Sequence, residues 1–111
     1  MKLLLILISP PETRGFRTSV SLAEAVWRRG HKVIIFSTGD GVESMKKNVA
    51  DSLAPCLMKL LKMGGRLLAC RESIRRRSSS QGSGLMEGVE MSSLAEMVEL
   101  MDLCDKTLVF D

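Results

Sequence analysis

The sequence predicts an α/β fold: a three-layer α/β/α sandwich with a mostly parallel sheet of four to five strands. Two observations support this prediction. Short apolar runs recur along the chain without polar–apolar alternation, as in strands that helices cover on both faces. Between these runs lie segments whose apolar residues follow helical spacing. Strand–helix alternation of this kind is typical of right-handed crossovers in a parallel sheet.

Four apolar runs are predicted strands: Leu3–Ile8, Val33–Phe36, Leu67–Cys70 (in a strand that begins at Arg66) and Leu108–Phe110. A fifth, short strand is expected near Val89–Met91. The first run superficially resembles a signal peptide, but it is near the lower limit of length for one and two prolines follow it, so a buried strand is the better interpretation. No run approaches the ~20 apolar residues that span a membrane, so we expect no membrane segment.

Three amphipathic helices are predicted between the strands, each with a start or stop signal. Gly30 ends the first, Ser52 caps the second, and Ser93 begins the third with Glu96 at capping-box spacing. Their apolar stripes are Leu22, Ala23, Val26 and Trp27; Leu53, Cys56, Leu57, Leu60 and Leu61; and Leu94, Met97, Val98 and Met101.

Length and composition indicate one domain. The chain has 111 residues, of which 45% are hydrophobic, enough for a single core over residues 1–111. The low-complexity segment 78–84 is built of small polar residues that contribute no core, so we expect a mobile loop there.

Charge and residue content argue against several functions. A net charge of +3 is too mild to indicate a nucleic-acid binder, and 4% aromatic residues leave few platforms for stacking bases or flavins. Three cysteines and one histidine cannot assemble a tetrahedral zinc site from this chain alone, so we expect no metal and no organic cofactor. The odd cysteine count favours reduced thiols and a cytoplasmic location.

Cys70 is the strongest candidate for chemistry. It ends a predicted strand, and reactive groups in parallel sheets collect at the carboxyl ends of the strands. A short helix over residues 72–77 would place Cys70 at a helix N-terminus, where backbone N–H groups, together with Arg71, Arg75 and Arg76, favour the thiolate. Alternatively, Cys70 is the last core residue of its strand and the arginines form a solvated face.

The loops that follow the first two strands are further candidates for ligand binding. Ser9 opens one, and Thr38, Gly39, Asp40 and Gly41 form the other. Both occupy the position where α/β folds hold phosphate, but neither carries a phosphate-loop motif, so stiff or tight turns are the alternative.

The other two cysteines and the histidine are expected to be structural. Cys56 and Cys104 lie on or beside apolar helical stripes, which favours core packing. His31 starts a strand at the edge opposite Cys70, which argues against a Cys/His hydrolase.

The order of these pieces resembles the DsrE/DsrF-like family, which includes the TusD-type sulfur relay proteins. The resemblance rests on the first strand with its proline turn, and on segments whose sequences are Arg29-Gly30-His31-Lys32-Val33, Thr38-Gly39-Asp40-Gly41-Val42, Gly64-Gly65-Arg66-Leu67-Leu68-Ala69-Cys70 and Gly88-Val89-Glu90-Met91. It implies a compact α/β/α sandwich that assembles as a homo-oligomer, a trimer or a hexamer. It also implies that Cys70 holds sulfane sulfur as a persulfide and relays it between donor and acceptor proteins.

The leading hypothesis is therefore a sulfur carrier or sulfurtransferase-like protein acting through Cys70. Whether the chain is an enzyme stays open, and sulfur transfer is the reaction class if it is one. The alternatives are a non-catalytic subunit of a DsrE-like oligomer and a small-ligand binding module that uses the two loops. A nucleic-acid partner ranks last, because a few arginines without aromatic residues are a weak signal.

Overall fold

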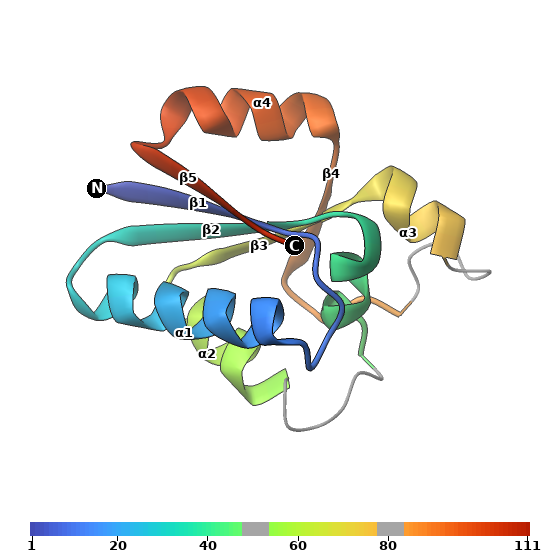
Figure 1. Cartoon of the computed structure of the whole chain (residues 1–111), viewed down its shortest axis with the longest axis horizontal. Coiled ribbons are helices and arrows are strands. Elements are labelled where there is room, and N and C mark those ends of the chain that lie inside the picture. The colour runs from blue at the N-terminus through green and yellow to red at the C-terminus, as the bar shows by residue number, and fades with distance from the viewer. Residues whose placement is uncertain (48–53, 78–83) are drawn as a thin grey trace.

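The computed structural model describes residues 1–47, 54–77 and 84–111 (Figure 1). The mobile loop predicted at 78–84 and the helix cap predicted at Ser52 lie outside the described residues, except for Gly84. The elements in chain order are β1 (Lys2–Leu7), α1 (Arg14–Arg28), β2 (Lys32–Ser37), the 3₁₀ helix η1 (Gly39–Met45), α2 (Ala54–Lys62), β3 (Arg66–Cys70), α3 (Arg71–Arg77), β4 (Val89–Ser92), α4 (Leu94–Leu103) and β5 (Lys106–Phe110).

The five strands form one sheet in the order β4-β3-β2-β1-β5, and every neighbouring pair is parallel. This confirms the predicted fold class, and the fifth strand expected near Val89–Met91 is present as β4, over Val89–Ser92. The first four strands lie side by side in chain order, from β1, which is next to one edge strand, to β4, which forms the opposite edge. The chain then crosses the sheet through α4 to place β5 at the other edge, beside β1.

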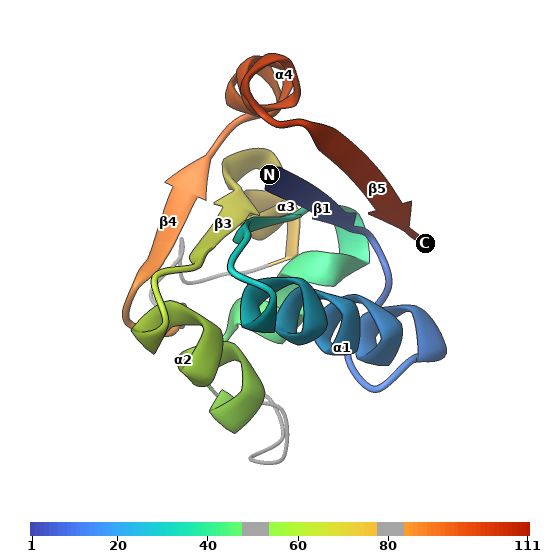
Figure 2. The same ribbon diagram turned by 90° about the vertical axis from the view of Figure 1, so that its left-hand side faces the viewer.

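Helices cover the two faces of the sheet unequally, as Figure 2 shows. One face packs against α1, α2 and η1, through a core that includes Leu5, Phe16 and Leu57. Of the described helices, α4 packs against the opposite face, through Leu100 and the alternate residues of the central strands, such as Phe36 and Leu68. Alternate residues of a strand point to opposite faces, so the apolar runs of β1, β2 and β3 supply both cores.

The helix termini follow the expected signals. Ser93 caps α4, its hydroxyl accepting the backbone N–H of Glu96 at 3.2 Å, and Thr13 caps α1 by the same bond to Phe16 at 3.2 Å. Gly30 takes the left-handed conformation that ends α1, with φ of 86°.

Two expectations about burial were wrong. Cys56 is exposed, because α2 turns Leu57 and Leu60 towards the sheet and leaves the preceding position outside. In β5, Leu108 and Val109 are exposed, because this strand forms the edge of the sheet. Within the described residues, none of the helices combines the length and apolar character needed to cross a membrane.

Candidate functional site

The carboxyl ends of all five strands meet at one edge of the sheet, because the strands are parallel. In Figure 1 this is the edge beside α3 and η1. Cys70 ends β3 there and lies in register with Ser92, the last residue of β4. On its other side, Ser37 of β2 pairs with Ala69, so Thr38 flanks Cys70.

Cys70 joins β3 directly to α3, which begins at the next residue. The thiol is buried, with 2% of the residue exposed, and it packs on the α4 side of the sheet. Burial raises the pKa of the thiol, but hydrogen bonds from the N–H and hydroxyl of Ser73, from the hydroxyl of Thr38 and from the N–H of Glu72 outweigh it. The pKa of Cys70 is therefore below the ordinary 9.0. The predicted helix N-terminus is confirmed, and it favours the thiolate.

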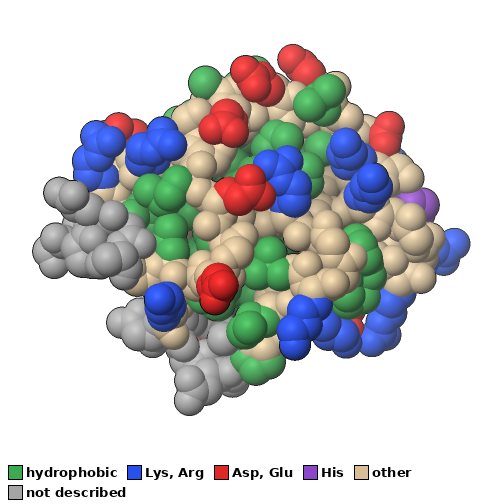
Figure 3. Space-filling view, turned by 180° about the vertical axis from the view of Figure 1, so that it is seen from behind, with side chains coloured by type: hydrophobic (Ala, Val, Ile, Leu, Met, Phe, Trp, Pro, Cys, Tyr) green, Lys and Arg blue, Asp and Glu red, His purple; other side chains and the backbone are tan. Residues whose placement is uncertain are grey.

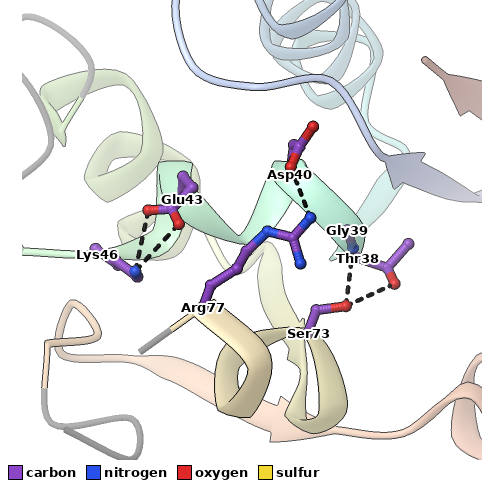
Figure 4. A network of polar contacts seen from close by, with 7 residues as sticks. All are labelled: Thr38, Gly39, Asp40, Glu43, Lys46, Ser73 and Arg77. Carbon is purple, nitrogen blue, oxygen red and sulfur yellow. Dashed lines mark hydrogen bonds and ion pairs between the residues drawn. The ribbon is translucent and has the colours of Figure 1, made fainter. Parts of the chain in front are cut away.

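Ser73, at the start of α3, contacts two residues that follow β2, Thr38 and Gly39 (Figure 4). Its hydroxyl accepts the backbone N–H of Gly39 at 2.9 Å and lies 3.2 Å from the hydroxyl of Thr38. Because the Gly39 amide occupies one lone pair, the Ser73 proton is free to point at Thr38 or at the sulfur. Two hydroxyls on different elements thus converge on Cys70.

Asp40 is engaged in an ion pair. Its carboxylate lies 2.6 Å from the guanidinium of Arg77, which joins η1 to the end of α3 (Figure 4). Asp40, the candidate acid of this loop, therefore helps to hold α3 at the carboxyl ends of the strands. At the end of η1, Glu43 forms a second ion pair, at 3.0 Å, with Lys46, the residue that follows the helix.

Gly41 is required by close packing. A Cβ atom at this position would overlap the carbonyl oxygen of Leu7, at the end of β1. Gly39 takes a left-handed conformation with φ of 57°, which favours glycine. Both glycines of the loop thus have structural causes, which supports the tight-turn interpretation of Thr38–Gly41.

The arginines of α3 stand at the surface beside this site. Arg71 and Arg75, with Ile74 and Met91, line a pocket of about 300 Å³. Arg75 also pairs with Glu72 at 3.3 Å, and Arg76 is exposed. Figure 3 shows basic side chains at several places on this face of the molecule, with acidic side chains among them. Hydrogen bonds, and not these guanidinium groups, cause the lowered pKa of Cys70.

The remaining candidates lie away from the thiol. The hydroxyl of Ser9 is buried without a hydrogen-bond partner among the described residues, and it occupies the space that a Cβ atom at Gly15, near the start of α1, would need. His31 lies at the opposite edge, with Nδ1 at 2.8 Å from the amino group of Met1. Cys104 packs partly against the core under α4, and burial raises the pKa of its thiol.

The sequence analysis missed Ser73. A signal for it exists: Ser73 is three residues after Cys70, so in a helix starting at Arg71 its N–H points back at the residue that precedes the helix. Backbone N–H groups and positive charge near Cys70 were predicted from the sequence, but the hydroxyl of Ser73 was not.

Among residues 1–47, 54–77 and 84–111, no cluster of His, Cys, Asp and Glu could hold a metal ion. Comparison with known proteins decides the family. The model of the DsrE/DsrF-like family matches residues 1–110. The chain belongs to the DsrE/DsrF-like family.

Solved structures show the same DsrE-like fold. The chain is similar to the ychN protein from E. coli, with a TM-score of 0.82, 20% identity and coverage of 98% of this chain and 97% of that one. It is also similar to MTH1491 of Methanobacterium thermoautotrophicum, a protein of unknown function, with a TM-score of 0.77, 14% identity and coverage of 95% and 96%. No curated protein matches the sequence significantly.

Proposed function

We propose that this DsrE-like protein is a sulfur carrier that holds sulfane sulfur as a persulfide on Cys70 and relays it to a partner protein in the cytoplasm. The observation that carries the proposal is the set of hydrogen bonds from Ser73, Thr38 and the start of α3, which lowers the pKa of this buried thiol. Membership of a family generally associated with sulfur relay supports it.

The chemistry needs only thiol groups. The Cys70 thiolate attacks the terminal sulfur of a donor persulfide, the donor S–S bond breaks, and the donor leaves as a thiolate. An acceptor thiolate then attacks the terminal sulfur held on Cys70, which returns Cys70 to the thiolate. The hydroxyls of Ser73 and Thr38 stabilise the negative charge on the sulfur in both steps.

Access is the second requirement, because Cys70 is almost wholly covered. A donor reaches the sulfur only if the structure opens at the carboxyl ends of the strands, where Cys70 lies. The positively charged rim formed by Arg71 and Arg75 would attract an anionic donor or acceptor surface to this edge.

The burial of Cys70 favours a second candidate, a non-catalytic subunit of an oligomer. In that case the thiol is a core residue and its partners are structural. The third candidate, a ligand-binding module, has less support, because polar groups of Thr38, Gly39 and Asp40 are bonded within the protein.

The apolar surface of α4 and β5 supports oligomer formation in either case. Exposed large apolar side chains gather on these two elements, and β5 also leaves one edge of the sheet unpaired. We therefore propose that the protein is a homo-oligomer, a trimer or a hexamer. The exposed side chains are Leu94, Val98, Met101, Leu103, Leu108 and Val109.

The experiment that tests sulfur transfer is loading by a cysteine desulfurase with cysteine, followed by mass spectrometry of tryptic peptides. Trypsin separates the three cysteines, because Cys70 falls on the peptide 67–71, Cys56 on 48–59 and Cys104 on 78–106. We expect a single added sulfur on peptide 67–71 that a reducing thiol removes. Sulfur confined to either other peptide would overturn the assignment to Cys70.

A matched accessibility measurement separates the two leading candidates. The native protein is treated with iodoacetamide, and the alkylated fraction of peptide 67–71 is followed in time against unfolded protein. Alkylation of native Cys70 supports the carrier. Complete protection, together with no loading by the desulfurase, would favour the non-catalytic subunit.

A further inference from the structure

Ser92 is a buried polar residue whose hydroxyl makes no hydrogen bond to the described residues. It is 0% exposed. Leaving a buried hydroxyl unpaired is costly, so such groups are uncommon in native proteins and often mark functional sites.

The position of Ser92 relates it to Cys70. Ser92 ends β4 and pairs in register with Cys70 at the end of β3. Residues paired directly in adjacent parallel strands point to the same face of the sheet, so the Ser92 side chain lies on the α4 side, with the thiol. Figure 2 shows β3 and β4 side by side below the start of α4.

Cys70 is therefore flanked by hydroxyl side chains on both sides. Thr38, which follows β2, is on one side; its hydroxyl lies 3.2 Å from that of Ser73, and both hydroxyls lower the pKa of the thiol. Ser92, at the end of β4, is on the other side, and its hydroxyl bonds to neither Cys70 nor any other described group. One flanking hydroxyl thus lowers the pKa of the free thiol, and the other has no partner among the described residues. A longer side chain at Cys70 would bring a second acceptor atom to this edge.

We propose that Ser92 donates a hydrogen bond to the terminal sulfur of the Cys70 persulfide. This inference rests on the proposed function and adds a residue that recognises the loaded state. The persulfide extends the cysteine side chain by one sulfur, which is anionic at neutral pH and accepts a charge-assisted hydrogen bond. Ser73 and Thr38 stabilise the sulfur of the cysteine itself, and Ser92 stabilises the sulfur that is transferred.

The test loads the protein without any partner. Inorganic hydrogen disulfide supplies the sulfur: the Cys70 thiolate attacks one sulfur, the S–S bond of the reagent breaks, and hydrosulfide leaves. The ratio of loaded to free peptide 67–71 is measured at a fixed ratio of hydrogen disulfide to hydrosulfide. We expect this ratio to fall about tenfold in Ser92→Ala, the effect of losing a hydrogen bond to a charged group.

Two further readouts separate this role from a structural one. Ser92→Ala removes a buried hydroxyl without a partner, so we expect its Tm to rise by a few degrees, and we expect the pH dependence of Cys70 alkylation to stay unchanged. Ser19→Ala is the matched control, because Ser19 is also fully buried but lies on α1, away from this edge. It should leave the loaded-to-free ratio unchanged.

The outcomes distinguish this inference from the proposed function. Equal loaded-to-free ratios in wild type and Ser92→Ala would overturn the role of Ser92 and leave the sulfur carrier intact. A lower Tm in Ser92→Ala would also overturn it, because the hydroxyl would then have a structural partner. Wild-type protein that hydrogen disulfide fails to load would overturn both proposals.

Discussion

The hydroxyl oxygen of Ser73 accepts the backbone N–H of Gly39 at 2.9 Å. This bond joins α3 to the loop after β2, at the point where Thr38 and Ser73 reach the thiol of Cys70. The same serine therefore fixes the geometry of the edge and stabilises negative charge on the sulfur. Its two effects can be separated by experiment.

Ser73→Ala should raise the pKa of Cys70, because the variant loses a hydroxyl that bonds to the thiolate and keeps the backbone N–H. The rate of Cys70 alkylation in native protein, measured against pH, should shift to higher pH and fall several-fold near neutrality. Thr38→Val removes the other hydroxyl and should shift the profile in the same direction. A profile unchanged in both variants would show that these hydroxyls do not act on the thiol.

Cys70 should make stability depend on pH. Its pKa is lowered by folding, so the stabilising contribution is fully present above the unfolded-state pKa, near the ordinary 9.0, and is lost as the pH falls through the folded-state pKa. The free energy of unfolding of wild type, relative to that of Cys70→Ser, should therefore increase as the pH is raised from about 7 to about 10. Urea unfolding under reducing conditions measures the free energy of unfolding of both proteins. A constant difference across this range would contradict the lowered pKa.

Gly41→Ala should destabilise the fold strongly, because the added methyl group would overlap the carbonyl oxygen of Leu7. We expect a loss of about 3 kcal/mol, at the upper end of the usual cost of overpacking. Gly84→Ala is the control, since a Cβ there has nothing within 4 Å. The urea midpoints of the two variants should differ clearly. Similar midpoints would mean that the loop after β2 accommodates the added methyl group with little loss of stability.

Asp40→Asn should have a small effect. The ion pair of Asp40 with Arg77 is short, at 2.6 Å, but the side chains are 59% and 31% exposed. Solvent weakens such pairs, which typically contribute ~0.2–1 kcal/mol. Thermal unfolding should therefore move by only a few degrees, and sulfur loading of Cys70 should persist. A complete loss of loading with the fold intact would restore Asp40 as a functional acid.

The apolar surface of α4 and β5 should control assembly. Val98→Asp places a charge on the exposed side of α4, and we expect it to dissociate the oligomer to monomers, as measured by light scattering with gel filtration. Met58→Asp is the control, because Met58 is another exposed apolar residue but lies on α2. If Val98→Asp leaves the mass unchanged, the interface lies elsewhere.

The central architecture could be predicted from sequence because its signals are local. The apolar runs of β1, β2 and β3 are continuous, since these strands are covered on both faces, and the helix signals at Gly30 and Ser93 are short-range. The place of Cys70 at the end of β3 followed from the same reasoning. The strand order did not, because nothing local in Lys106–Phe110 states that it pairs with β1.

The errors came from tertiary placement. An apolar stripe shows which side of a helix faces the core only to within one or two positions, and α2 turns far enough to leave Cys56 outside. The network at Cys70 depends on β2 and β3 ending side by side, which brings Thr38 and Gly39 to Ser73 from more than thirty positions away in sequence. A contact of this kind cannot be read from residue spacing.

The position of β5 also has a consequence for synthesis of the protein. β1 emerges early from the ribosome but has β5, from the other end of the sequence, as one of its two neighbours in the sheet. The nascent chain therefore carries an open apolar strand edge until Lys106–Phe110 has been translated, however early the other strands have paired. An open edge of this kind is prone to aggregate, and pairing with Lys106–Phe110 is the step that covers this edge of β1.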